Sequence, residues 1–133
     1  MLKFGSVCLP VILIVSLFIS ACGGQPRQPS APTAAQLAET GKTVYATHCA
    51  ECHGDNEDGI TAPAITGVNA RLAKYNTGQG LMDYVNTAMP QDNPGSLSQQ
   101  DYLNVVGYLL VENNFISPGT PLDANRLGNI TLK

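Results

Sequence analysis

The first clear pattern along the chain is a set of buried-type positions at helical spacing. Between residues 34 and 49, small or apolar side chains and one histidine stand at positions i, i+4, i+7, i+8 and i+11: Leu37, Gly41, Val44, Tyr45 and His48. An α-helix has about 3.6 residues per turn, so this spacing places them on one face. The pattern predicts an amphipathic helix over this stretch.

A second and cleaner stripe lies near the other end of the chain. Apolar residues stand at positions i, i+3, i+4, i+7 and i+8: Tyr102, Val105, Val106, Leu109 and Leu110. Ser98 followed by Asp101 is typical of a helix start, because a serine hydroxyl can cap backbone N–H groups and an acid is favourable there. The two signals together predict a helix that begins after Ser98.

A third and shorter pattern lies between these two. Residues 80–88 predict a short helix with Leu81, Tyr84 and Val85 facing inward. We find no convincing strand pattern, so the predicted fold class is all-α. About 100 residues remain for this part of the chain once the N-terminal segment is set aside, which fits one domain with a modest core.

Directly after the first predicted helix stands the run Cys49-Ala50-Glu51-Cys52-His53, which is a C-x-x-C-H motif. Two thiols at this spacing can add to the two vinyl groups of a haem, and the next residue then supplies a proximal nitrogen to the iron. A thioredoxin-like pair would be expected near a βαβ pattern, and a zinc site would need a second ligand pair; the sequence offers neither. The motif predicts one covalent haem c, held by Cys49 and Cys52, with His53 as an axial ligand.

The N-terminus has the pattern of a bacterial lipoprotein signal. Lys3 precedes thirteen residues, 7–19, that are apolar or small apart from one serine. This run is shorter than a membrane span and typical of a signal peptide. The sequence Ile19-Ser20-Ala21-Cys22 resembles a lipobox, which predicts a signal peptide over 1–21 and lipidation of Cys22. Ordinary cleavage at a small residue and an uncleaved anchor are the alternatives.

The sequence also divides the mature chain into three segments. Residues 22–35 are rich in proline and lack large apolar side chains, so they predict a lipid-anchored tether that reaches roughly 30–40 Å if extended. Residues 36–116 form the predicted haem domain. Residues 117–133 form a C-terminal extension that either wraps on the domain or docks a partner. These features predict a location on the periplasmic side of a bacterial membrane, or on the outer face of the cell membrane.

Charge and cysteine content restrict the possible partners and the possible disulfide bonds. Without Lys3, six basic residues stand against ten acidic ones, a net charge near −4, which argues against nucleic acid as a partner. Cys8 lies in the predicted signal peptide and Cys22 is assigned to lipid. The other two cysteines belong to the haem motif, so no pair is left for a disulfide.

Several segments resemble the class I cytochromes c over about residues 36–116. Gly41-x-x-x-Tyr45-x-x-x-Cys49 resembles that family's N-terminal helix, where a small residue lets the C-terminal helix cross closely. Val105 and Tyr108 resemble the contact positions of that C-terminal helix. The resemblance implies the class I cytochrome c fold, three to five helices around one covalently bound haem c. The stretch Val106-Gly107-Tyr108-Leu109-Leu110 is particularly similar to cytochrome domains of pyrroloquinoline-quinone dehydrogenases and other bacterial oxidoreductases.

The same resemblance implies further residues around the iron. Thr61-Ala62-Pro63-Ala64-Ile65 is similar to a segment whose proline carbonyl accepts a hydrogen bond from the axial histidine, so Pro63 would orient His53. Ala88-Met89-Pro90 resembles the distal-ligand motif, which makes Met89 the expected second axial ligand. A thioether favours ferrous iron and raises the potential. The alternative for Met89 is a place in the core, the role we assign to Met82.

The implied function is single-electron transfer between redox protein partners, with no small-molecule substrate and no enzymatic activity. One alternative is an electron-accepting subunit tightly bound to a periplasmic dehydrogenase or sulfur-oxidising enzyme. Another is a five-coordinate peroxidase-like or gas-sensing haem protein, which would leave Met89 unbound. Four acidic residues beside the haem motif predict either a solvated loop or a face that docks a basic partner: Glu51, Asp55, Glu57 and Asp58.

Overall fold

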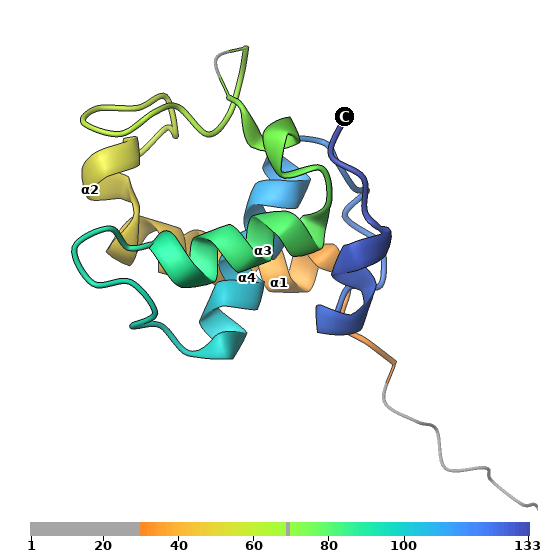
Figure 1. Ribbon diagram of the computed structural model, residues 1–133. Coiled ribbons are helices and arrows are strands. Elements are labelled where there is room, and N and C mark those ends of the chain that lie inside the picture. Colours follow the sequence, from red (N-terminus) through yellow and green to blue (C-terminus); the bar gives the residue numbers. More distant parts are fainter. Residues whose placement is uncertain (1–29, 69) are drawn as a thin grey trace, which may run out of the picture.

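The computed structural model describes residues 30–68 and 70–133. The predicted signal peptide, Cys22 and most of the predicted tether lie outside these residues. The described part is helical (Figure 1), and its ordered elements are, in chain order, α1 Ala34–His48, α2 Ala50–His53, the 3-10 helix η1 Leu72–Tyr75, α3 Gly78–Ala88, α4 Gln99–Glu112 and the 3-10 helix η2 Ala124–Asn129. Within this part, β pairing is limited to two isolated bridges. The predicted all-α fold class is confirmed.

Helix α1 begins at a capping box. The Thr33 side chain accepts the Gln36 N–H at 3.3 Å, and the Gln36 side chain accepts the Thr33 N–H at 2.8 Å. These two bonds satisfy backbone donors that a helix start otherwise leaves free. The helix ends at His48, one residue before the predicted end. His48 is exposed, whereas the other four residues of the predicted face are buried: Leu37, Gly41, Val44 and Tyr45.

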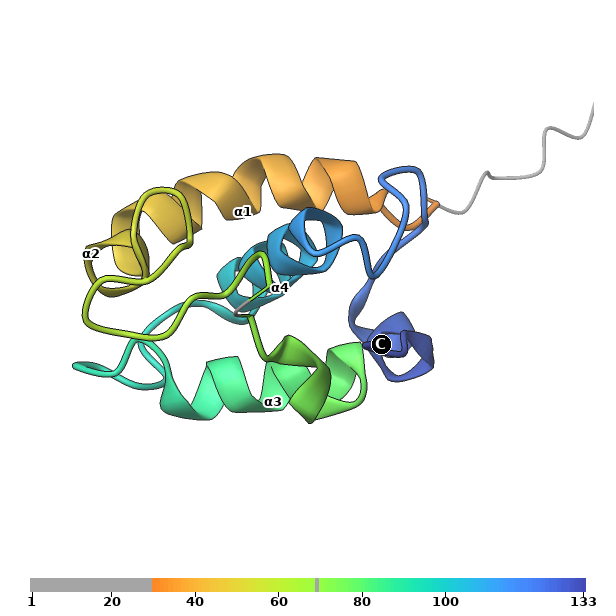
Figure 2. The ribbon, with the colours of Figure 1, turned by 90° about the horizontal axis from the view of Figure 1, so that it is seen from above.

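Helices α1 and α4 cross at a pair of glycines. A Cβ atom added to Gly41 would lie 2.8 Å from the Cβ of Tyr108, and one added to Gly107 would lie 2.9 Å from the Cβ of Leu37. Such distances are shorter than real packing allows, so each helix approaches the other where a side chain is missing. Figure 2 shows α4 lying between α1 and α3. Tyr108 therefore lies at the helix contact, as the resemblance implied, whereas Val105 lines the cavity described below.

The other two predicted helices also form. Ser98 caps α4 by accepting the Asp101 N–H at 3.1 Å, as the sequence predicted. Helix α3 starts two residues before its predicted start and buries Leu81, Met82 and Val85. Met82 is 8% exposed, so its predicted place in the core is confirmed. No helix within the described residues has the length and apolar character needed to cross a bilayer.

The C-terminal extension packs on the domain, the first of the two alternatives for it. Its three leucines are buried: Leu122, Leu127 and Leu132. Backbone hydrogen bonds tie it to the start of α1, from Ala34 N to Thr120 O at 2.8 Å, and to the start of α3, from Gly78 N to Ile130 O at 2.9 Å. Both ribbon views place the extension at the end of the molecule opposite α2 (Figures 1 and 2).

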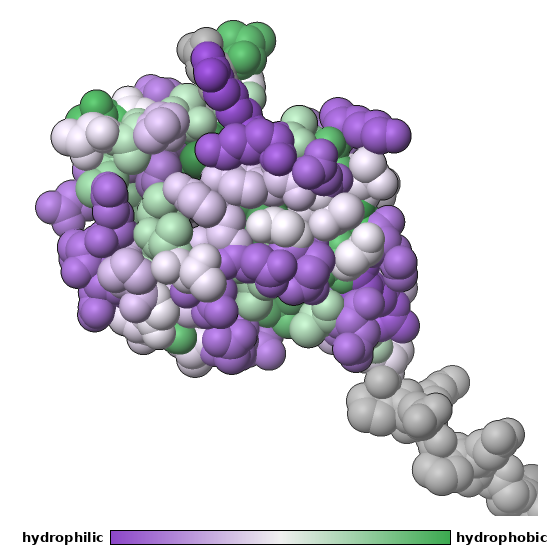
Figure 3. Space-filling model, in the orientation of Figure 1, coloured by the Kyte–Doolittle hydropathy of each residue, from purple (hydrophilic) through white to green (hydrophobic). Residues whose placement is uncertain are grey.

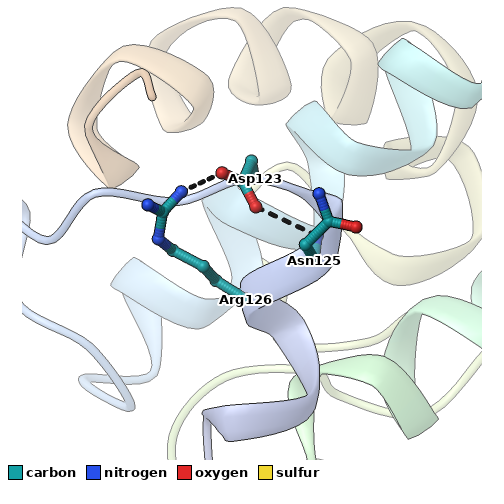
Figure 4. Close-up of polar contacts among 3 residues, drawn as sticks. All are labelled: Asp123, Asn125 and Arg126. Atoms are coloured by element: carbon teal, nitrogen blue, oxygen red, sulfur yellow. Dashed lines mark hydrogen bonds and ion pairs between the residues drawn. The ribbon is translucent and has the colours of Figure 1, made fainter. Parts of the chain in front are cut away.

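A local polar contact shapes the turn of this extension. The Asp123 side chain accepts the Asn125 N–H at 3.0 Å and forms an ion pair with Arg126 (Figure 4). Asp123 is therefore the N-cap of η2, which presents Leu127 to the core. The sequence alone did not predict this helix.

Candidate functional site

A cavity of about 890 Å³ lies among α2, α3, α4 and the loop that follows α2. This volume falls within the range of roughly 300–1,000 Å³ typical of sites for small molecules and cofactors. Apolar side chains from several elements line it: Ile65, Leu72, Leu81, Val85, Val105 and Leu109. The cavity therefore suits a large apolar body.

One wall of the cavity carries the C-x-x-C-H motif. The single-turn helix α2 follows α1 almost without a break, and Cys49, Cys52 and His53 all line the cavity. Burial, and next the neighbouring Cys52, raise the pKa of the Cys49 thiol to about 11, so the free thiol is neutral at pH 7. Both thiols are free of disulfide bonds. The elements thus bring the three motif residues to one surface.

The carbonyl of Pro63 lies against the histidine of this wall. His53 Nδ1 is 2.8 Å from Pro63 O, so the Nδ1–H tautomer donates to that carbonyl. In the neutral ring of this tautomer, the other nitrogen, Nε2, carries the lone pair that can bind a metal. This is the contact that the family resemblance implied for Pro63.

The loop after α2 is folded so that Pro63 can reach the histidine. Cys52 O accepts the N–H groups of three successive residues, 60–62, at 3.0–3.1 Å, and His53 O accepts the Gly59 N–H at 2.8 Å. Gly54 and Gly59 have φ values of 86° and 87°, in the left-handed region that favours glycine. The chain therefore doubles back over α2.

Met89 lines the same cavity from the end of α3. It is the C-cap of that helix, with its N–H donating to Val85 O at 3.0 Å. Its carbonyl accepts the Tyr102 hydroxyl at 2.8 Å, which ties it to α4. Met82, in contrast, is absent from the cavity lining. The two methionines of α3 therefore have different environments, although axial ligation by Met89 stays a prediction.

The cavity rim is aromatic and cationic. The rings of Tyr75 and Tyr84 lie 4.7 Å apart, and Lys74 Nζ lies 4.8 Å and 5.5 Å from their centroids. Burial, and next the hydrogen bond and charge of Tyr84, raise the pKa of Tyr75 above its usual value. Tyr84 is 37% exposed, but it lines the same cavity as Leu81 and Val85, so its predicted inward side faces the cavity, where its ring lies beside that of Tyr75. Together with the exposed Arg71, this rim suits the carboxylates of a cofactor.

The four residues of the acidic cluster differ in their exposure to solvent. Glu51, Asp55 and Asp58 are exposed, whereas Glu57 is only 5% exposed and accepts the Tyr108 hydroxyl. The expectation that all four form one solvated or docking surface is therefore wrong for Glu57. Its φ of 61° turns the backbone so that the side chain points inward, which sequence spacing does not reveal.

Two buried tyrosines near this loop were not assigned a site role from the sequence. The Tyr45 hydroxyl donates to Gly54 O at 2.7 Å, and its ring lies 5.7 Å from that of Tyr108. Burial, and next the hydrogen bond to Glu57, raise the pKa of Tyr108 above its usual value. Burial, and next the charge of Glu57, do the same for Tyr45. The hydrophobic pattern placed Tyr45 on a buried face, and the family resemblance placed Tyr108 at a helix contact, but neither predicted their polar contacts with the loop.

The donor set fits a haem. One wall offers two thiols and an imidazole whose second nitrogen is already hydrogen-bonded, and Met89 offers a thioether from another element. The walls between are apolar and the rim is polar. A small helical domain with these features is a haem-binding domain of the cytochrome c class.

Comparisons with known proteins agree with this class. Residues 36–109 match the family described as cytochrome C oxidase, cbb3-type, subunit III. The chain is 30% identical over 94 residues to the cytochrome c-553-like protein of Synechocystis sp., which covers 71% of this chain and 89% of that relative. The chain therefore belongs to this family of cytochrome c proteins, and its cofactor is covalently bound haem c. The predicted family and cofactor are confirmed.

The fold is also similar to that of a solved structure. A chain in the crystal structure of the sulfane dehydrogenase SoxCD from Paracoccus pantotrophus superimposes with a TM-score of 0.62 at 23% identity. The match covers 99% of this chain and 68% of the other. At this level of identity the similarity concerns the fold alone.

Proposed function

We propose that this protein is a single-electron carrier whose iron is held by His53 and Met89. The observation that carries the proposal is that the C-x-x-C-H motif, the Pro63 carbonyl and Met89 line one cavity. When bound, haem c supplies a one-electron Fe(II)/Fe(III) couple. The cytochrome c family supports a carrier rather than a catalyst.

Each residue at the site has a separate role in this proposed carrier. Cys49 and Cys52 anchor the cofactor through their sulfur atoms, so it stays with the chain in both oxidation states. His53 presents a nitrogen that the bond to Pro63 orients and makes more basic. Met89 presents a soft, neutral sulfur, which favours the ferrous state. If His53 and Met89 both hold the iron, no position would be left on it for a substrate.

A redox titration of the purified holoprotein tests this proposal. We expect one reversible wave with a slope near 59 mV per tenfold change in the ratio of oxidised to reduced protein, because one electron is exchanged. We also expect the reduced wild type to bind no CO. Rapid CO binding by the wild type would instead support the five-coordinate peroxidase-like or sensor alternative.

A tightly bound enzyme subunit is the second candidate function. The fold similarity to SoxCD, which spans nearly the whole chain, favours this candidate. The free carrier and the subunit use the same residues around the iron, so site variants do not separate them. Purification under mild conditions does: stable association with a larger catalytic chain would favour the subunit, and a monomeric fraction would favour the carrier.

The three exposed acids beside the haem motif form the docking face in this proposal: Glu51, Asp55 and Asp58. Their partner would be a redox protein with a basic face. Electron-transfer rates between the two should fall as salt is raised, because the Debye length shrinks from about 10 Å at 0.1 M to about 3 Å at 1 M. Replacing all three by their amides should remove most of this dependence, with exposed Asp83 to Asn as the matched control. If the electron-transfer rates change neither with salt nor in the triple variant, these acids are an ordinary solvated surface.

Membrane attachment through Cys22 completes the proposal and lies outside the described residues. A signal peptide over 1–21 would be removed, and the tether 22–35 would hold the domain near the periplasmic or outer face of a membrane. Stable attachment takes more than one acyl chain, which a lipoprotein cysteine provides. Cys22→Ser should move the protein from the membrane fraction to the soluble fraction or block its processing, whereas Cys8→Ser should change neither. A mature wild-type protein without lipid, detected by mass spectrometry, would contradict this.

A further inference from the structure

A buried acid with an unusual environment lies in the loop after α2. Among the described residues, Glu57 is the charged side chain in the buried class. The one ion pair within the described residues joins Asp123 and Arg126, in the C-terminal extension. The side-chain partner of the Glu57 carboxylate is the Tyr108 hydroxyl. Burying a carboxylate with no cation beside it is unfavourable, so the contact needs a compensating benefit.

The backbone of Glu57 carries a second unfavourable feature. Three non-glycine residues of the described chain have positive φ, Glu57 at 61°, Asn76 at 64° and Asn114 at 57°. Asparagine tolerates this region well, but glutamate does not share that preference. Strained residues gather at sites where geometry matters for function, so the strain at Glu57 is a reason to ask what it holds.

Glu57 connects α4 to the segment that carries Pro63. Its carbonyl accepts the Ile65 N–H at 2.9 Å and the Thr66 N–H at 3.4 Å, so it fixes the chain two and three residues beyond Pro63. Its side chain is fixed in turn to Tyr108 of α4. Asn113 Nδ2 donates to Ile65 O at 3.0 Å, which is a second tie between this segment and the end of α4.

We propose that Glu57 and Tyr108 are positioning residues that hold the Pro63 carbonyl against His53 Nδ1 and so set the reduction potential of the protein. This inference rests on the proposed role of His53 as an axial ligand. The hydrogen bond to Pro63 O makes the imidazole a stronger donor to the iron, which favours the ferric state. A loosened loop weakens that bond and raises the potential.

Three variants of the full-length holoprotein test the proposal. Glu57→Ala and Tyr108→Phe remove the tie between the loop and α4, whereas Glu57→Gln keeps an oxygen that accepts the Tyr108 hydroxyl but removes the charge. Two quantities are measured: the midpoint potential by redox titration, and the exchange rate of the His53 Nδ1 proton by NMR of the reduced protein. Asn56→Ala, which changes an exposed side chain of the same loop, is the control.

We expect both untied variants to shift the potential upward and to exchange the His53 ring proton roughly two- to tenfold faster, the range that corresponds to the net value of one hydrogen bond. Glu57→Gln and Asn56→Ala should remain close to the wild type in both measurements. If the buried charge alone set the potential, Glu57→Gln would shift it as far as Glu57→Ala, with proton exchange unchanged. That result would overturn the proposal.

Two further outcomes are decisive. If the untied variants only lower the unfolding free energy, while potential and proton exchange stay at wild-type values, the pair is a packing contact and the proposal is wrong. If the wild type itself shows no ring-proton signal of a ligated histidine, the proposed ligation by His53 has failed instead. The two failures are therefore distinguishable, and Tyr108→Phe, which removes only the hydroxyl, keeps the test open if Glu57→Ala does not fold.

Discussion

Replacing Cys49 and Cys52 together by alanine should abolish covalent haem attachment. After denaturation and extraction with acidified acetone, the wild type should keep its haem on the polypeptide, whereas the double variant should lose essentially all of it. The physical reason is that His53 and Met89 bind only through the iron, and these bonds do not survive unfolding in acid. Haem staining of a denaturing gel, with total protein as the reference, measures the loss.

The remaining cysteines offer a matched control for this experiment. Cys22→Ser should keep all of its haem, because lipidation and haem attachment are separate modifications. Each single variant, Cys49→Ala or Cys52→Ala, should retain haem through one thioether, with a shifted visible spectrum because one vinyl group is left unreacted. A wild-type protein whose haem extracts freely would contradict the covalent site itself.

The helices were predictable because their signals are local and agree with one another. The apolar stripes, the Ser98 cap and the short C-x-x-C-H motif all lie within a few turns of chain, where spacing translates directly into position. The crossing at Gly41, in contrast, was implied by the family resemblance, and the structure places Gly41 against Tyr108 there. At the same crossing Gly107 of α4 packs against Leu37 of α1, which explains why a glycine stands in the middle of α4.

The contacts that the sequence did not predict join residues far apart in the chain. Tyr84 lies on the inward face of α3 as predicted, but the sequence did not show that its ring lies 4.7 Å from that of Tyr75 in η1, beside the cavity. Glu57 stands among acids that are exposed, yet a left-handed backbone turns it toward Tyr108, 51 positions later in the chain. Neither the ring pair nor the backbone angle leaves a periodic signal.

The site was partly predictable for the same reason. The cysteines and His53 follow from one pentapeptide, and their shared wall follows from a single turn of helix. Pro63 and Met89 came from resemblance to a family, because they lie ten and 36 positions after His53 in the chain. Only the fold places Pro63 O at 2.8 Å from the ring and brings Met89 to the same cavity.

The methionine is the part of the site whose substitution should change the chemistry most while leaving the cofactor in place. Met89→Ala should keep haem attached, lower the midpoint potential by on the order of 0.1 V or more, and admit CO to the reduced protein. Axial ligands alter haem potentials over about 0.8 V, so a lost thioether accounts for a shift of this size. The backbone of residue 89 should stay in place, because its N–H and carbonyl are bonded to Val85 and Tyr102.

Met82 provides the matched control for this second prediction, seven positions earlier in α3. Its side chain is 8% exposed and outside the cavity lining, so Met82→Ala should cost roughly 2–5 kcal/mol of unfolding free energy and leave potential and CO binding unchanged. Met89→His should also lower the potential, because imidazole stabilises ferric iron better than a thioether does, but it should not admit CO readily. If Met82→Ala lost the wild-type spectrum and Met89→Ala kept it, the ligand assignment would be reversed. If neither variant changed the potential, the iron would lack a methionine ligand, and the peroxidase-like or sensor function would replace the electron carrier.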